Sequence, residues 1–122
     1  MTVIRRTSEI APVTLDRAPV RSRRVISAAD GARLGLSVMD IDGVHPWIAV
    51  DGTDIVYYVL AGAGWFELDD VRHDVTQGDV LLVPGGTPYR YGGAMSYLNI
   101  QSPPMAPAAV RWLDDVGADS AE

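Results

Sequence analysis

The chain has 122 residues and a mass of 13.1 kDa, which is enough for one hydrophobic core but not for two. Apolar residues make up 48% and charged residues 21%, and no stretch approaches the roughly 18 uninterrupted apolar residues of a membrane span, so no membrane segment is expected. The sequence has neither cysteine nor lysine, which excludes disulfides, thiol nucleophiles, cysteine-bound metals and lysine Schiff bases, and a cytoplasmic protein fits best.

The first segment differs in charge from the rest of the chain. Six of the 10 basic residues, all arginine, lie in the first 24 residues beside two acids, which gives about +4. The other four arginines face fourteen acids, which gives about −10. This acidic body argues against nucleic acid as a partner, because phosphate binding needs clustered cations. Residues 1–24 are therefore a basic N-terminal arm, either a recognition tail or a segment laid against the acidic body.

Strand patterns dominate from residue 20 to residue 102. They consist of short runs rich in β-branched and aromatic residues. The expected strands are residues 20–27, 33–41, 54–60, 65–68, 71–75, 80–83, 89–91 and 95–101. Gly, Pro and Asp separate these runs and predict turns. The expected turns include Asp30-Gly31, Ala61–Gly64, Asp69-Asp70, Pro84–Pro88 and Gly92-Gly93.

Short strands at this spacing, with no helical period between them, predict a sandwich or barrel rather than a parallel α/β sheet. Residues 107–116 are the exception and predict a short helix, because Pro107 suits a first helical turn and Trp112 could dock on the barrel. The expected fold is all-β and single-domain. The barrel should occupy residues 25–104, and a short helix and tail residues 105–122.

The spacing of Gly78, Pro84 and Gly86 resembles the second motif of the cupin (double-stranded β-helix) superfamily. Tyr89 stands where that motif has a metal-binding histidine. Upstream, the segment that ends at Gly62 resembles the end of the first cupin motif, with Ile55 at its glutamate position. The resemblance implies a small jelly-roll barrel whose usual metal ligands have been replaced.

Within the superfamily, the chain is most similar to the metal-poor cupins of ethanolamine-utilisation operons. Those proteins carry a Pro-Trp pair, an acidic patch and a Val-Leu-x-Gly turn, which correspond here to Pro46-Trp47, Asp54 and Val59–Gly62. The similarity spans about residues 34–104. It implies no single reaction, because cupin barrels host isomerases, epimerases, dioxygenases, decarboxylases, lyases, cyclases and non-enzymatic binders.

Two histidines are too few for a histidine-rich metal site. His73 follows a predicted turn and should be exposed. His45 lies on the loop that enters the barrel, where it either reaches the mouth and binds a ligand or packs the loop. We expect no metal and no cofactor, with an oxygen-rich site of His45, Asp51, Asp54 and a tyrosine as the alternative.

The candidate catalytic residues are tyrosines and aspartates. Alternation along the strands, combined with the inward ligand positions that the resemblance implies, predicts that Tyr57, Tyr89 and Tyr91 face the lumen. Tyr57 and Tyr89 would act as acids on a carbonyl and Tyr91 would bind the ligand, with Asp54 or Asp51 as the base. The alternative is that these tyrosines only fill the core.

Two further groups have less certain places. Trp47 either lines the mouth of the barrel or packs beneath the loop. Tyr97, Asn99 and Gln101 share one face of the last predicted strand, and an outer solvated face or a dimer seam is favoured over the pocket for them.

Three functions follow in order. The first is a metal-independent small-molecule cupin, an isomerase, cyclase, lyase or dehydratase acting on an oxygenated or aromatic metabolite. The second is a cupin that binds a small ligand or assembles with a partner without turnover, and the third is an atypical metal-dependent cupin. Whether the chain is an enzyme stays open at this point. The resemblance also implies a homodimer paired through an edge strand.

Overall fold

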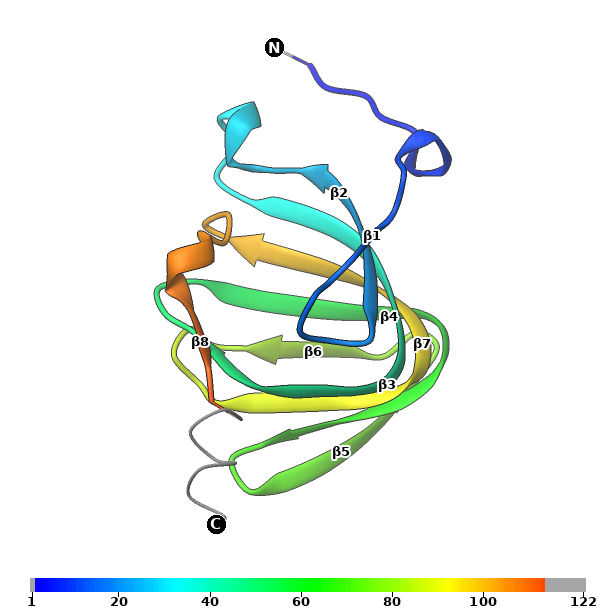
Figure 1. Cartoon of the computed structure of the whole chain (residues 1–122), viewed down its shortest axis with the longest axis vertical. Helices are drawn as coiled ribbons and strands as arrows, with labels where there is room; N and C mark the ends of the chain where they lie inside the picture. Colours follow the sequence, from blue (N-terminus) through cyan, green and yellow to red (C-terminus); the bar gives the residue numbers. More distant parts are fainter. Residues whose placement is uncertain (1, 114–122) are drawn as a thin grey trace.

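The computed structural model describes residues 2–113, which form one eight-stranded antiparallel sheet that curls into a barrel (Figure 1). The strands follow the order β1-β2-β3-β7-β4-β5, while β6 pairs with β4 and β8 with β3. The elements are η1 (Thr7–Glu9), β1 (Val13–Thr14), β2 (Val20–Ile26), η2 (Ala28–Asp30), β3 (Gly35–Val50), β4 (Asp54–Leu68), β5 (Val71–Thr76), β6 (Val80–Val83), β7 (Tyr89–Ser102), η3 (Pro107–Ala109) and β8 (Val110–Trp112). The described residues contain no helix long and apolar enough to cross a membrane.

Three long strands, β3, β4 and β7, build both walls of the barrel. In Figure 1 each of them bends at one side of the molecule, so that its two halves lie in opposite walls. The bend falls where Gly93 pairs with both Gly43 and Gly64. A Cβ on Gly64 would lie 2.3 Å from the carbonyl oxygen of Gly92, so the strands can meet this closely only without a side chain. The turns expected at Ala61–Gly64 and Gly92-Gly93 are therefore wrong, because these glycines bend continuous strands instead of ending them.

The tight turns at the strand ends confirm the other expectations. β2 pairs antiparallel with β3, as predicted for the hairpin around Asp30-Gly31. Asp69 and Asp70 have φ angles of 53° and 60° and connect β4 to β5 by a two-residue turn. Positive φ at both central residues matches the twist of the flanking strands, and aspartate tolerates this conformation better than most residues.

The predicted C-terminal helix is wrong over the residues that the structure describes. One turn of 3₁₀ helix, η3, is followed by β8, in which Val110 pairs with Val50 and Trp112 with Ile48 of β3. The half-buried apolar side chains of Val110 and Trp112 pack against the core, so pairing with the edge of β3 satisfies both the backbone and these side chains. Residues 114–116 of the expected helix lie outside the described residues.

Strand alternation divides the barrel into an aromatic inside and a partly apolar outside. Phe66, Tyr89 and Tyr97 are at most 1% exposed and rank among the largest buried side chains. On the outside, four apolar side chains of β4 and β6 are 38–61% exposed, and we call them the outer apolar face. They are Tyr58, Leu60, Val80 and Leu82.

Candidate functional site

A pocket with a volume of about 80 Å³ lies between the two walls of the barrel. Its walls come from β3, β4 and β7, and its rim from half-buried residues of the N-terminal segment and of residues 105–112. The lining residues are Leu15, Met39, His45, Ile48, Ile55, Tyr57, Tyr89, Tyr91, Asn99, Met105, Val110 and Trp112. The pocket is therefore mainly apolar and aromatic, with a few polar groups that could orient a ligand.

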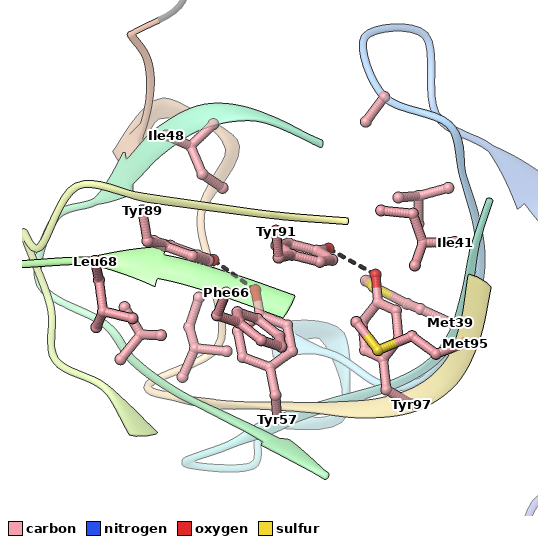
Figure 2. Close-up of a cluster of buried hydrophobic side chains, with 14 of the residues drawn as sticks. Met39, Ile41, Ile48, Tyr57, Phe66, Leu68, Tyr89, Tyr91, Met95 and Tyr97 are labelled. Atoms are coloured by element: carbon pink, nitrogen blue, oxygen red, sulfur yellow. Dashed lines mark hydrogen bonds between the residues drawn. The ribbon is translucent and has the colours of Figure 1, made fainter. Parts of the chain in front are cut away.

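Four tyrosines form two hydrogen-bonded pairs inside the barrel (Figure 2). The hydroxyls of Tyr57 and Tyr89 lie 2.5 Å apart, and those of Tyr91 and Tyr97 lie 2.6 Å apart. The ring of Tyr57 also contacts Phe66, with 4.9 Å between the ring centroids. Tyr57, Tyr89 and Tyr91 line the pocket, as the sequence predicted for their orientation, whereas Tyr97 is not among the lining residues.

All four of these hydroxyls stay protonated. Burial away from water penalises the phenolate and raises the pKa values of all four above the ordinary 10.0, to about 12 for Tyr91. Neighbouring tyrosines add to the rise at Tyr57, because a second phenolate in the cluster would repel the first. The pocket wall therefore presents neutral O–H groups, which donate hydrogen bonds.

His45 of β3 is 4% exposed and lies in the pocket wall. Its ring stacks on Tyr91, with 4.8 Å between centroids, and on Trp112, with 5.7 Å. Nδ1 lies 2.7 Å from the carbonyl oxygen of Pro46. A carbonyl only accepts, so Nδ1 must carry the hydrogen, and in the neutral ring the lone pair belongs to Nε2. The fold thus selects one tautomer of a buried imidazole beside the tyrosines.

Asn99 and Gln101 lie inside the barrel, so the outer face favoured for Tyr97, Asn99 and Gln101 is wrong. Their exposed fractions are 0% for Tyr97, 4% for Asn99 and 8% for Gln101. The physical reason is the continuity of β7 through Gly93, which keeps all its odd-numbered residues from Tyr89 onward on one face. That parity is the signal that would have placed Asn99 in the pocket.

The other predicted site residues lie away from the pocket. Asp51 is exposed and bonds to the guanidinium of Arg111 at 2.8 and 3.1 Å. Asp54 is also exposed and accepts a hydrogen bond of 2.8 Å from the backbone N–H of Gly85. Neither aspartate is among the lining residues, so the structure does not bring either to the tyrosine hydroxyls.

Trp47 is half-buried outside the pocket, where the guanidinium of Arg90 lies 5.2 Å from its ring centroid. His73 is exposed, as expected. Sequence reasoning missed Met105 at the rim, because it lies beyond the predicted barrel. It predicted Trp112 only as a helical docking residue, although both residues line the pocket.

The residues at the expected ligand positions do not fit a metal ion. Tyr89 is a neutral phenol bonded to Tyr57, and Ile55 offers no donor atom. No three His, Cys, Asp or Glu side chains of residues 2–113 form a group that could hold a metal. His45 is therefore not part of such a metal-binding group within the described part of the chain.

Comparison with known families agrees with the barrel fold. A family model described as a cupin domain matches residues 36–98, which is more than half of the chain. The chain belongs to the cupin family. No curated protein matches its sequence.

Solved structures of other cupin-like proteins have a similar fold. A protein from Planctomyces limnophilus has a TM-score of 0.82 and 23% identity, over 92% of this chain and 96% of that one. A nucleoside dehydratase from Streptomyces has a TM-score of 0.77 and 16% identity, over 92% and 91%. The polyketide cyclase RemF from Streptomyces resistomycificus has a TM-score of 0.77 and 21% identity, over 93% and 86%. The dehydratase has also been solved with uridine as variants that change a histidine to glutamine or a tyrosine to phenylalanine.

Proposed function

We propose that this cupin is a metal-independent enzyme that dehydrates, cyclises or isomerises a small oxygenated or aromatic molecule in the tyrosine-lined pocket. The observation that carries the proposal is that His45 and the Tyr57–Tyr89 pair line the same buried pocket. Phenols with raised pKa values act as neutral donors, and the buried imidazole beside them can accept a proton. Proton transfer is therefore the chemistry that these groups support.

The proposed reaction begins at a carbonyl oxygen of the substrate, which accepts a hydrogen bond from the Tyr57–Tyr89 pair. The two hydroxyls share one bond, which uses one of their two protons, so the other proton is available to the substrate. Nε2 of His45 then removes a proton from the carbon next to the carbonyl. The electron pair expels a hydroxyl group from the following carbon, and that group takes the proton from His45 and leaves as water.

Isomerisation follows the same first step, but the proton returns from His45 to a different carbon. Neither route changes the oxidation state of the substrate, so acid–base groups are sufficient. This scheme gives the role of the base to His45 instead of Asp51 or Asp54, because His45 is the one of the three that lines the pocket. The aspartate-base hypothesis stays a prediction with its own test below.

The similar folds support this class of reaction. A nucleoside dehydratase and a polyketide cyclase share the barrel, and the dehydratase variants solved with uridine change residue types, histidine and tyrosine, that also meet in the present pocket. At these identities the likeness is one of fold, so the proposal rests on the pocket.

Binding of a small ligand without turnover is the second candidate function, and the size of the pocket limits the ligand in either case. A cavity that holds a benzene ring measures on the order of 150 Å³, whereas this pocket measures about 80 Å³. A ring-sized ligand must therefore displace half-buried rim side chains such as Met105 and Trp112. The resemblance to ethanolamine-utilisation cupins that the sequence suggests at Pro46-Trp47 and Val59–Gly62 is the reason to include an assembly role in this candidate.

The test is a turnover screen of the chelator-treated protein. A panel of β-hydroxy carbonyl compounds and nucleosides, uridine included, is followed by mass spectrometry for loss of water. We expect turnover to survive the chelator, to be lost in His45→Gln and to persist in Asp54→Asn. Loss of turnover in Asp54→Asn with His45→Gln active would restore the aspartate base. Binding without turnover would favour the second function, and turnover that requires added metal would favour a metal-dependent cupin.

We also infer a homodimer in which a second copy covers the outer apolar face. Register places Val80, Tyr58, Leu98, Val38 and Arg23 in one row across the sheet. The row has an arginine at one end and, beside Val80, Asp79 at the other. Two copies stacked with their rows reversed would bury apolar side chains in the middle and place opposite charges over each other.

A further inference from the structure

Asn99 is a buried carboxamide in the pocket wall that the proposed reaction does not use. It is 4% exposed, lines the pocket and lies directly across the strand pair from Tyr57. Cross-strand neighbours on one face lie close together, so a ligand that reaches the Tyr57 hydroxyl also passes Asn99. The direction of the Asn99 amide therefore decides what the pocket offers to a ligand at this point.

A short chain of hydrogen bonds fixes that direction. The backbone N–H of Met105 donates to Oε1 of Gln101 at 3.0 Å, and Nε2 of Gln101 donates to Oδ1 of Asn99 at 2.9 Å. A backbone N–H can only donate, so the oxygen of Gln101 must face Met105 and its NH₂ group must face Asn99. Asn99 consequently turns its oxygen toward Gln101 and has its NH₂ group at the other end.

The NH₂ group of Asn99 opens onto the pocket. Among residues 2–113, Asn99 forms hydrogen bonds through its Oδ1 atom and its backbone, but none through Nδ2. Every side-chain nitrogen or oxygen that is fully buried in this part of the chain has a hydrogen-bond partner, so Nδ2 is not fully buried. The Nδ2 atom therefore keeps accessible space, and Gln101, at the oxygen end, is not among the lining residues. A donor in a mainly apolar wall favours a ligand that brings an acceptor.

The geometry points to Asn99 as a specificity-determining residue that donates from Nδ2 to a carbonyl oxygen of the ligand, which makes a neutral, carbonyl-bearing molecule the preferred class. This inference rests on the proposed function, because it uses the same pocket. A ligand without the carbonyl leaves the NH₂ group unpaired, which is how a polar group in a pocket discriminates between ligands.

Gln101 is a positioning residue in this arrangement, since it acts through Asn99. Met105 connects this hydrogen-bond chain to the rim of the pocket. Its backbone N–H orients Gln101, and Met105 also lines the pocket. A carboxylate at position 101 would accept from both sides. It would therefore turn the Asn99 NH₂ group away from the pocket without changing the size of the wall.

Two probes of nearly equal shape test the hydrogen bond from Asn99 and its orientation by Gln101. One is para-fluoroacetophenone, which has a carbonyl group, and the other is para-fluoro-α-methylstyrene, which has a C=CH₂ group in its place. Their dissociation constants are measured by fluorine NMR, and the quantity compared between variants is the ratio of the alkene constant to the ketone constant. This ratio cancels the general change in pocket shape and the different hydrophobicity of the probes. We expect Asn99→Leu to lower it about five- to tenfold relative to the unmodified chain, the factor of one neutral hydrogen bond.

Gln101→Glu, measured above neutral pH, is the second variant, and we expect it to lower the ratio while the alkene still binds. Ser37→Ala is the matched control, because Ser37 is a buried cross-strand neighbour of Asn99 that does not line the pocket, and its ratio should not change. An unchanged ratio in both Asn99→Leu and Gln101→Glu would overturn the inference and leave the proposed function intact. Failure of both probes to bind the unmodified chain would overturn the inference together with the ring-binding pocket on which it rests.

Discussion

The hydrogen bond between Tyr57 and Tyr89 should show strong energetic coupling in a double-mutant cycle. Tyr57→Phe or Tyr89→Phe removes one hydroxyl but keeps the ring, so the packing of the core is largely preserved. The remaining hydroxyl then loses its partner in an apolar wall, which costs about 1–3 kcal/mol of unfolding free energy. The double change removes both polar groups together and should cost little more than either single change, because no buried hydroxyl of the pair is left unpaired.

The expected interaction energy in this cycle is therefore about −1 to −3 kcal/mol. Urea unfolding followed by tryptophan fluorescence measures it, with equal slopes for all four proteins as a check that unfolding stays two-state. Tyr89 and Tyr97 form the control cycle, since they belong to different hydrogen-bonded pairs and should be additive within about 0.5 kcal/mol. Additivity of Tyr57→Phe and Tyr89→Phe would show that the pair does not exist in solution.

Three further predictions concern the buried phenols, the bend and the dimer. In a Tyr58→Phe background, the folded protein should show no phenolate absorbance at about pH 10.5, and denaturation at that pH should reveal about three equivalents of phenolate, because the four remaining tyrosines, with an unfolded pKa of about 10, are then about three quarters ionised. Because the folded-state pKa values are raised, these tyrosines stabilise the fold below about pH 10, and that stability falls as pH rises further. Gly64→Ala should lower the unfolding free energy by about 3 kcal/mol or more, because its Cβ would lie 2.3 Å from a carbonyl oxygen. The control is Gly52→Ala, which should cost about 1 kcal/mol, because Gly52 has a φ of +73° but nothing within 4 Å of an added Cβ. Equal costs would mean that the strands do not meet closely at the bend. Leu82→Asp should dissociate the proposed dimer and so halve the molecular mass measured by light scattering. Val71→Asp is the control and should leave the mass unchanged, because Val71 is exposed on β5 away from the outer apolar face. An unchanged mass in Leu82→Asp would exclude pairing through this face.

The positions of Gly and Pro predicted the fold because their effects on the backbone are local: Gly permits positive φ angles and Pro fixes φ, wherever the rest of the chain lies. The spacing of Gly78, Pro84 and Gly86 needs no knowledge of distant contacts, and the cupin family is confirmed. The same rule failed at Gly93, because there the absence of a Cβ serves the contact with Gly64 on a neighbouring strand. A glycine pair reads the same in sequence whether it ends a strand or bends one.

The candidate site was predictable only as far as strand parity was applied consistently. Parity placed Tyr57 inside, and the same parity places Asp54, three residues earlier, on the outside, where the structure has it. The resemblance to an acidic patch had drawn Asp54 into the site despite that conflict. Strand alternation could not have placed Met105 and Trp112 in the pocket, because residues 105–112 reach it only through the pairing of β8 with β3.

Replacement of the histidine position by Tyr89 changes the kind of ligand that the barrel can hold. To replace the histidine as a metal ligand, Tyr89 would have to become a phenolate, whereas burial keeps the Tyr57 and Tyr89 hydroxyls protonated. The polar groups with which the pocket can contact a ligand are therefore the neutral tyrosine hydroxyls, the His45 imidazole and the Asn99 amide. Because transfer of a charged group into such a wall is costly, a neutral substrate is favoured, and its affinity should depend little on salt concentration.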